Sequence, residues 1–201
     1  MPLRPMPTDI DLYPTTLGPI GPFFHFLTPE WGTPDRTPGI MAGPGAKGEH
    51  IQLKVHVLDR AGKPVTNAMI ELWQADGGGK YNHPADTQQK TPDPDFQGFG
   101  RLASNDEGLC VFDTVKPGRV PGVSGELQAP HISVSIFAPG LLRRVVTRIY
   151  FAGDPANDSD HVLNLVPADR RGTLFAQPSG PSEWTFDLYL TGPCETAFFD
   201  I

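Results

Sequence analysis

The chain has 201 residues, enough for one domain with a sizeable core, and its 22 Gly and 23 Pro predict many turns and few long helices. A formal net charge of −7 argues against nucleic acid and anionic membrane surfaces as partners. Two cysteines are too few for a disulfide framework, no apolar run reaches membrane length, and the N-terminus lacks the apolar core of a secretion signal, so we expect a cytoplasmic protein.

The first 48 residues are rich in proline and glycine, yet they carry "FFHFL" (23–27) and Trp31. A disordered tail rarely holds so many aromatic side chains. We therefore predict an N-terminal arm over residues 1–48, packed on its own domain or partly against another chain. The domain itself is expected over residues 49–201.

From Glu49 onward, short stretches alternate apolar and polar residues, which is the period of a half-buried strand. Tight turns are expected at "DRAGKP" (59–64) and "NDEG" (105–108), and a short helix within "DSDHVLNLV" (158–166). Such short, closely spaced strands are typical of an antiparallel sandwich or barrel. The expected strands, in chain order, are "HIQLKVHVLD" (50–59), "AMIELWQA" (68–75), "LCVFDTV" (109–115), "HISVSIF" (131–137), "RRVVTRIYF" (143–151) and "EWTFDLYL" (183–190), with "ETAFFD" (195–200) able to pair at the C-terminus.

Two long loops, 77–101 and 116–130, interrupt these strands, and loops of this length in a compact sandwich usually serve a function. They flank Tyr81 and His131, whose phenol and imidazole would meet at one end of the sandwich if their strands are neighbours. That pair suits ferric iron, whereas a histidine hydrogen-bonded to a tyrosine is the structural alternative. The other histidines of the predicted domain that lie on or near its strands, namely His50, His56 and His161, are expected to be structural or at the surface.

Several motifs in order resemble those of the intradiol ring-cleavage dioxygenases. They are "IELWQADGGGKYNH" (70–83), "FGR" (99–101), "TVKPG" (114–118), "APHISVSIFAPG" (129–140) and "RIYFAGD" (148–154). The resemblance implies a mixed-topology β-sandwich and a reaction in which O2 cleaves the ring of a small aromatic catechol between its two hydroxylated carbons. It also implies a non-haem ferric ion held by two tyrosines and two histidines.

The resemblance places the four iron ligands at Tyr81, Val120, His131 and Ser133, of which only Tyr81 and His131 keep the expected residue type. Gln128 stands where an arginine is expected. Valine has no donor atom, serine is a poor neutral ligand, and a trivalent cation needs anionic oxygen to offset its dehydration. We therefore predict four vestigial ligand positions, no bound metal and no catalytic residue in this chain.

That pattern, with "GPFFH" (21–25) and "ETAFFDI" (195–201), resembles the family's alpha chains, which pair with an iron-bearing beta chain of the same fold. The resemblance implies that Gly21 and Pro22 of the arm line the partner's substrate site. Pro19 and Pro139 replace polar residues expected near the substrate entrance, which leaves the exact catechol open.

Two alternatives remain open from the sequence. One is a lone intradiol dioxygenase with a rearranged site, in which His83 or His25 supplies a missing ligand. The other is a non-catalytic binding module with a related sandwich fold.

Overall fold

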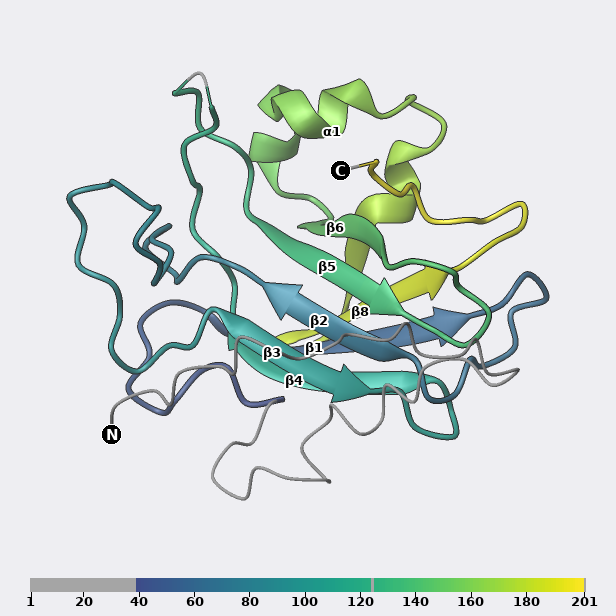
Figure 1. The fold of residues 1–201 in the computed structure, drawn as a ribbon. Coiled ribbons are helices and arrows are strands. Elements are labelled where there is room, and N and C mark those ends of the chain that lie inside the picture. The colour runs from purple at the N-terminus through teal and green to yellow at the C-terminus, as the bar shows by residue number, and fades with distance from the viewer. Residues whose placement is uncertain (1–38, 124, 201) are drawn as a thin grey trace, which may run out of the picture.

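The computed structural model describes residues 39–123 and 125–200, so the predicted arm contacts of Gly21 and Pro22 lie outside the described residues, as do Pro19 and His25. The described chain is mainly β, which confirms the predicted fold class (Figure 1). Its elements are β1 (His50–Leu58), β2 (Met69–Trp73), β3 (Phe99–Ala103), β4 (Leu109–Val115), β5 (His131–Phe137), β6 (Val145–Phe151), the 3₁₀ helix η3 (Pro155–Ser159), α1 (His161–Leu165), the 3₁₀ helix η4 (Arg171–Leu174), β7 (Phe175–Gly180) and β8 (Glu183–Tyr189).

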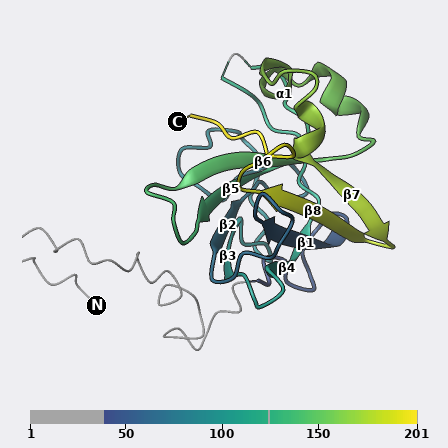
Figure 2. The same cartoon turned by 90° about the vertical axis from the view of Figure 1, so that its right-hand side faces the viewer.

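The strands are ordered β3-β2-β5-β6-β7-β8-β1-β4, and the sheet folds into two halves that are joined where β6 pairs with β7 (Figure 2). Two pairings, β1 with β8 and β6 with β7, are parallel. The residue pattern alone predicted an antiparallel sheet, and this was wrong at these two pairings. Alternation reports which face of a strand is buried, but not which distant strand lies beside it. The mixed topology implied by the family resemblance is confirmed.

The core lies between the two halves of the sheet and is built from alternate residues of each strand, as in Ile132, Val134 and Ile136 of β5. His131, Ser133 and Ser135 therefore point to the opposite face of β5, as the sequence predicts. A second apolar cluster, which includes Tyr150, lies on that opposite face of β6, beneath α1 and η4 (Figures 1 and 2). Helical segments thus close one end of this face, and the rest remains open to the long loops.

The structure corrects several predicted boundaries. The fifth predicted strand begins at Val145 rather than Arg143, and the first long loop ends at Gly98 because β3 begins at Phe99. Neither β3 nor β7 was predicted, since β3 is short and mostly half-buried, and β7 contains Pro178 and Gly180. The short helix is confirmed as α1, and "ETAFFD" pairs through a single bridge between Phe199 and Val146.

Part of the segment assigned to the arm belongs to the sandwich. Met41, Ala42 and Ala46 pack in the main core, and Ile40 bridges to Asp113 of β4. The described residues preceding β1 thus hold the chain against the sheet half that contains β4. No helix in the described ranges has the length and apolarity needed to cross a membrane.

Candidate functional site

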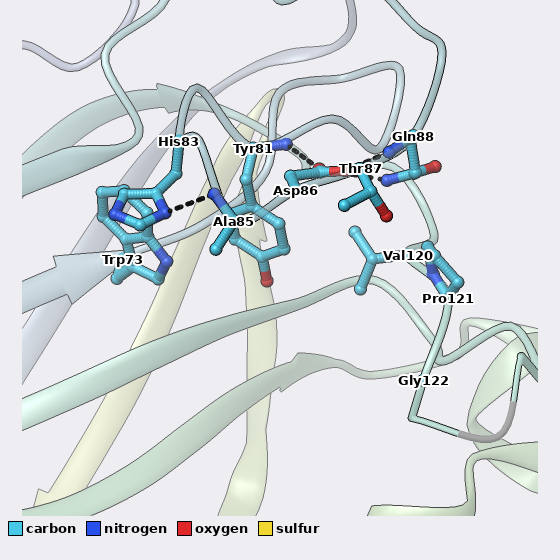
Figure 3. A pocket seen from close by; sticks show the side chains of 10 residues that line it. All are labelled: Trp73, Tyr81, His83, Ala85, Asp86, Thr87, Gln88, Val120, Pro121 and Gly122. Atoms are coloured by element: carbon cyan, nitrogen blue, oxygen red, sulfur yellow. Dashed lines mark hydrogen bonds between the residues drawn. The ribbon is translucent and has the colours of Figure 1, made fainter.

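A cavity of about 380 Å³ lies beside the end of β2 and the start of β5, where the two long loops meet (Figure 3). Its volume is in the range typical of small-molecule sites. The structure therefore brings Tyr81 and Val120, from different loops, to one cavity. The lining residues are Trp73, Tyr81, His83, Ala85, Asp86, Thr87, Gln88, Val120, Pro121 and Gly122.

Two carboxylates fix the loop that carries Tyr81. Asp76 accepts hydrogen bonds from the backbone N–H groups of Gly78 and Lys80, each at 2.9 Å, and Asp86 accepts one from the N–H of Tyr81 at 2.8 Å. Burial alone would raise the pKa of Asp86, but hydrogen bonds from Tyr81, Gln88 and Lys80 hold it at about 2. Asp86 therefore stays ionised at neutral pH, and its buried contact with Lys80 at 3.0 Å helps to hold the loop.

Gly79 joins this loop to the one that carries Val120. It has a φ of +75°, and a Cβ added there would overlap the carbonyl oxygen of Arg119. Gly62, in the turn after β1, has the same φ of +75° with nothing within 4 Å of an added Cβ. The two glycines thus share the same φ, and their surroundings differ.

We expect Gly62→Ala to lower the free energy of unfolding by about 1–2 kcal/mol through backbone strain alone. Gly79→Ala should cost about 1–3 kcal/mol more, because the Arg119 carbonyl must move. Urea unfolding monitored by circular dichroism gives both values. Equal losses at the two sites would show that the loops are not held together at Gly79.

Beside the cavity, a row of three side chains crosses neighbouring strands, and of the three only Trp73 lines the cavity. Trp73 of β2 is paired with Ser133 of β5, and Ser133 is paired with Arg148 of β6. Directly paired residues point to the same face of a sheet, so all three lie on the face opposite the core. The Trp73 ring stacks on Tyr81 with centroids 5.8 Å apart and planes 9° apart, and His83 meets it edge-on at 6.0 Å.

His131 lies two residues before Ser133 on the same face, and the pairing of β2 with β5 confirms that the strands next to Tyr81 and His131 are neighbours. The Nδ1 atom of His131 donates to the carbonyl of Ala129 at 2.8 Å, and its ring contacts Tyr150 at 5.8 Å. The Nδ1 atom of His131 thus bonds to a carbonyl, and the contact shown between His131 and a tyrosine is the ring contact with Tyr150.

Both expected ligands that remain are neutral at pH 7. Burial, followed by the nearby Arg148 cation, lowers the pKa of His131 to about 4. With Nδ1–H bound to a carbonyl, the neutral ring carries its lone pair on Nε2. Burial raises the pKa of the Tyr81 phenol, and Arg148 offsets that rise only in part. The pair therefore presents one phenol and one imidazole, with no negative charge.

This donor set does not fit a trivalent iron. Val120 is 4% exposed and has no donor atom, and Ser133 offers only a neutral hydroxyl. Within residues 39–123 and 125–200, no three His, Cys, Asp or Glu side chains gather as a metal site requires. The Arg148 guanidinium near both Tyr81 and His131 further opposes a second cation.

Arg148 is the site residue that sequence reasoning missed. Its Nη1 donates to Oε1 of Gln128 at 2.7 Å and to the Tyr150 hydroxyl at 3.4 Å. The resemblance expects an arginine at position 128, where this chain has Gln128. A guanidinium is nevertheless present there, because Arg148 of β6 donates to the Gln128 side chain. The motif "RIYFAGD" contains Arg148, but only the β5–β6 register shows that it lies next to Ser133.

The remaining described histidines lie away from this row or at its edge. His50 Nε2 is 2.8 Å from the Ala46 carbonyl, His56 Nδ1 is 2.9 Å from Asp187, and His161 Nδ1 is 3.1 Å from Glu126. Each of the three has a polar atom near one ring nitrogen outside the row, and their structural or surface roles stay a prediction.

Comparison with known proteins gives a consistent result. The family model described as "Dioxygenase" matches residues 21–192. The protocatechuate 3,4-dioxygenase alpha chain of Burkholderia cepacia is 40% identical over 194 residues, which cover 90% of this chain and 94% of that one. The beta chain of the same enzyme from that organism is 36% identical over 154 residues, covering 72% of this chain and 66% of that one.

Solved structures support the same fold. The dioxygenase domain of a dioxygenase carbohydrate-binding protein fusion from Streptomyces sp. SirexAA-E superposes with a TM-score of 0.58 at 28% identity. The match covers 79% of this chain and 88% of that one. The sandwich described above is thus shared with this dioxygenase domain.

Proposed function

Since this chain belongs to the intradiol ring-cleavage dioxygenase family, we propose that it is the iron-free alpha subunit of a protocatechuate 3,4-dioxygenase. Such an enzyme uses O2 to cleave protocatechuate to 3-carboxy-cis,cis-muconate, a step of aromatic degradation in the β-ketoadipate pathway. The resemblance to an alpha chain over nearly its whole length supports this assignment.

One observation carries the proposal, namely the donor set of the cavity. The family implies non-haem iron in the enzyme, yet Val120 and Ser133 stand where the resemblance expects two further ligands. Relatives that are separate alpha and beta chains imply a hetero-oligomer. We therefore assign the Fe(III) and its catalytic ligands to the beta subunit, and the vestigial positions to this chain.

In this proposal the chain contributes to catalysis by shaping the partner's site. Gly21 and Pro22 of the arm line the substrate entrance, and the sandwich supplies the surface on which the beta chain docks. Holding a catechol and O2 in a fixed, enclosed geometry accelerates the reaction without any metal ligand from this chain.

The alternative of a lone dioxygenase with a rearranged site is disfavoured by the state of His83. Its Nδ1 accepts a hydrogen bond from the backbone N–H of Ala85 at 3.1 Å, so the neutral ring carries its proton on Nε2. Neither nitrogen then offers a free lone pair to a metal. The fold does not distinguish an enzyme subunit from a non-catalytic binding module, because one fold hosts many functions, so activity of the complex separates the two.

The test is co-expression with a beta chain that has the full set of tyrosine and histidine ligands. The full chain purified alone should hold no stoichiometric iron, whereas the complex should hold one ferric ion per pair and consume O2 with protocatechuate. Tyr81→Phe in this chain should leave the iron content of the complex unchanged. Deletion of residues 15–26 should lower turnover at constant iron content.

One tightly bound ferric ion in the isolated chain, with a tyrosinate charge-transfer band, would instead support the lone dioxygenase. A complex that forms but gains no activity over the beta chain alone would support the binding module.

A further inference from the structure

We propose that residues 23–31 pack on the outer face of β2 and β5 of their own chain. This face carries Met69, Ser135 and Phe137, which point away from the main core. The inference concerns packing within one chain, so it does not depend on the proposed beta subunit.

The described chain begins between the two edge strands of the sheet. The N–H groups of Met41 and Ala42 donate to the carbonyl of Asp113 in β4, at 2.8 and 3.2 Å. A Cβ added to Gly39 would lie 3.1 Å from Cδ1 of Leu102 in β3. The residues that precede Gly39 therefore start beside β3, which pairs with β2.

The length of the preceding segment fits this face. Trp31 lies eight residues before Gly39, and an extended chain covers about 3.3 Å per residue, so this stretch can span about 26 Å. The distance from β3 to β5 is two strand spacings, or about 10 Å. Residues 23–31 can thus lie across β2 and β5 while the chain stays connected.

The other outer face near this point is that of β1 and β8, and it is charged. It carries the ion pair of Lys54 with Glu183 at 2.7 Å, and His56 lies 2.9 Å from Asp187. An apolar segment laid over these groups would strip water from them at a cost in free energy. Polarity therefore favours the face of β2 and β5.

The face of β2 and β5 suits an apolar segment. Met69 is 2% exposed, yet it belongs to neither apolar cluster of the described residues, so its burial requires cover beyond those clusters. Ser135 is small, which leaves room above β5 for an aromatic ring beside Phe137. Glu71 of β2 is paired with Arg101, so covering it buries no unpaired carboxylate.

The segment itself needs such a face, because large apolar side chains form most of it. A run of this kind left in water is an exposed apolar patch, which folded proteins avoid unless it binds something. Fixing it would also anchor the neighbouring residues 21 and 22, which the proposed function assigns to the partner's site. The large apolar residues are Phe23, Phe24, Phe26, Leu27 and Trp31.

The test is oxidation by hydrogen peroxide of the full chain and of a chain that lacks residues 1–31. Both proteins contain Met41 and Met69, which are 1% and 2% exposed. The deletion should speed sulfoxide formation at Met69 at least tenfold, because peroxide attacks an accessible thioether. Met41, in the main core, should react at an unchanged rate. Peptide mass spectrometry gives both rates.

If circular dichroism shows that the shortened chain does not fold, Ser135→Lys in the full chain tests the same contact. The new ammonium would lose water beneath the segment, so the segment should leave the face. Chymotrypsin should then cleave within residues 23–31 at least tenfold faster. Ser179→Lys, at an exposed serine of β7, should leave the cleavage rate unchanged.

Where the chain purifies only with a partner, both measurements are made on the complex. Protection of Met69 that survives the deletion would assign its cover to other residues and overturn the inference. Protection that depends on protein concentration would assign the cover to a second copy and overturn it too, as would equal cleavage of the Ser135→Lys and Ser179→Lys variants. These readouts involve neither iron nor turnover, so the proposed function stands or fails separately.

Discussion

Asp160→Ala should lower the free energy of unfolding by about 3–5 kcal/mol, because it removes a buried carboxylate that satisfies three donors at once. Asp160 caps α1 by accepting from the N–H of Leu163 at 2.8 Å. It also accepts from the N–H of Ala129 at 2.7 Å and from the Tyr150 hydroxyl at 3.2 Å. Without this carboxylate, the buried N–H groups of Ala129 and Leu163 and the Tyr150 hydroxyl lose their acceptor. Urea unfolding measures the change.

Two control variants, Asp158→Ala and Asp160→Asn, test whether the loss comes from the hydrogen bonds of Asp160. Asp158→Ala, at an exposed carboxylate in η3, should change stability by no more than about 0.5 kcal/mol. Asp160→Asn should fall between the two, because the amide oxygen still accepts hydrogen bonds while its NH2 group faces other donors. A loss in Asp160→Ala no larger than in Asp158→Ala would contradict the view that Asp160 organises this region.

Restoring the two missing ligands should convert this chain into an iron-binding protein, but only when Arg148 is also replaced. The pair Val120→Tyr and Ser133→His supplies a second phenol and a second imidazole, and a histidine at 133 points to the same face as His131. However, position 133 is paired with Arg148, whose cation would face the incoming metal. We therefore expect weak binding in the double variant and about one ferric ion per chain after adding Arg148→Gln.

Iron analysis and the tyrosinate charge-transfer band check this expectation. Adding Arg143→Gln to the double variant, in place of Arg148→Gln, should leave its weak binding unchanged. Ring cleavage is expected to stay low in all variants, because the hydrogen bonds that orient metal ligands for catalysis are not restored by these substitutions. If the double and triple variants take up iron equally, then Arg148 has no part in excluding the metal.

Most of the fold was predictable because burial follows alternation. Ile51, Leu53, Val55 and Val57 mark β1 in the sequence and fill the core in the structure. The turn at 105–108 was predictable because "NDEG" holds an asparagine and a glycine at turn positions. In the structure Asn105 accepts hydrogen bonds from the N–H groups of Glu107 and Leu109, and Gly108 has a positive φ. β7 was not predictable, because a strand containing Pro178 and Gly180 has no such alternation and pairs only through its neighbours.

The candidate site was predictable only in part, for a related reason. The motifs located Tyr81 and His131. The residue types at positions 120 and 133, valine and serine, showed that the expected iron-donor atoms are missing there. Arg148 was missed because its importance comes from register: the sequence does not show that position 148 faces position 133 across two strands. A cross-strand neighbour is a property of the folded sheet, not of any local pattern.

The parallel pairing of β1 with β8 governs how this chain can fold during synthesis. β1 lies between β4 and β8, so one of its edges stays unpaired from the time Leu58 is made until Glu183–Tyr189 follows. Contacts this distant in sequence slow folding, and an open strand edge invites pairing with other nascent chains. Among the described residues, β8 is the last strand and completes the half of the sheet that β1 begins, so a chain cut short before residue 183 is expected to aggregate rather than fold.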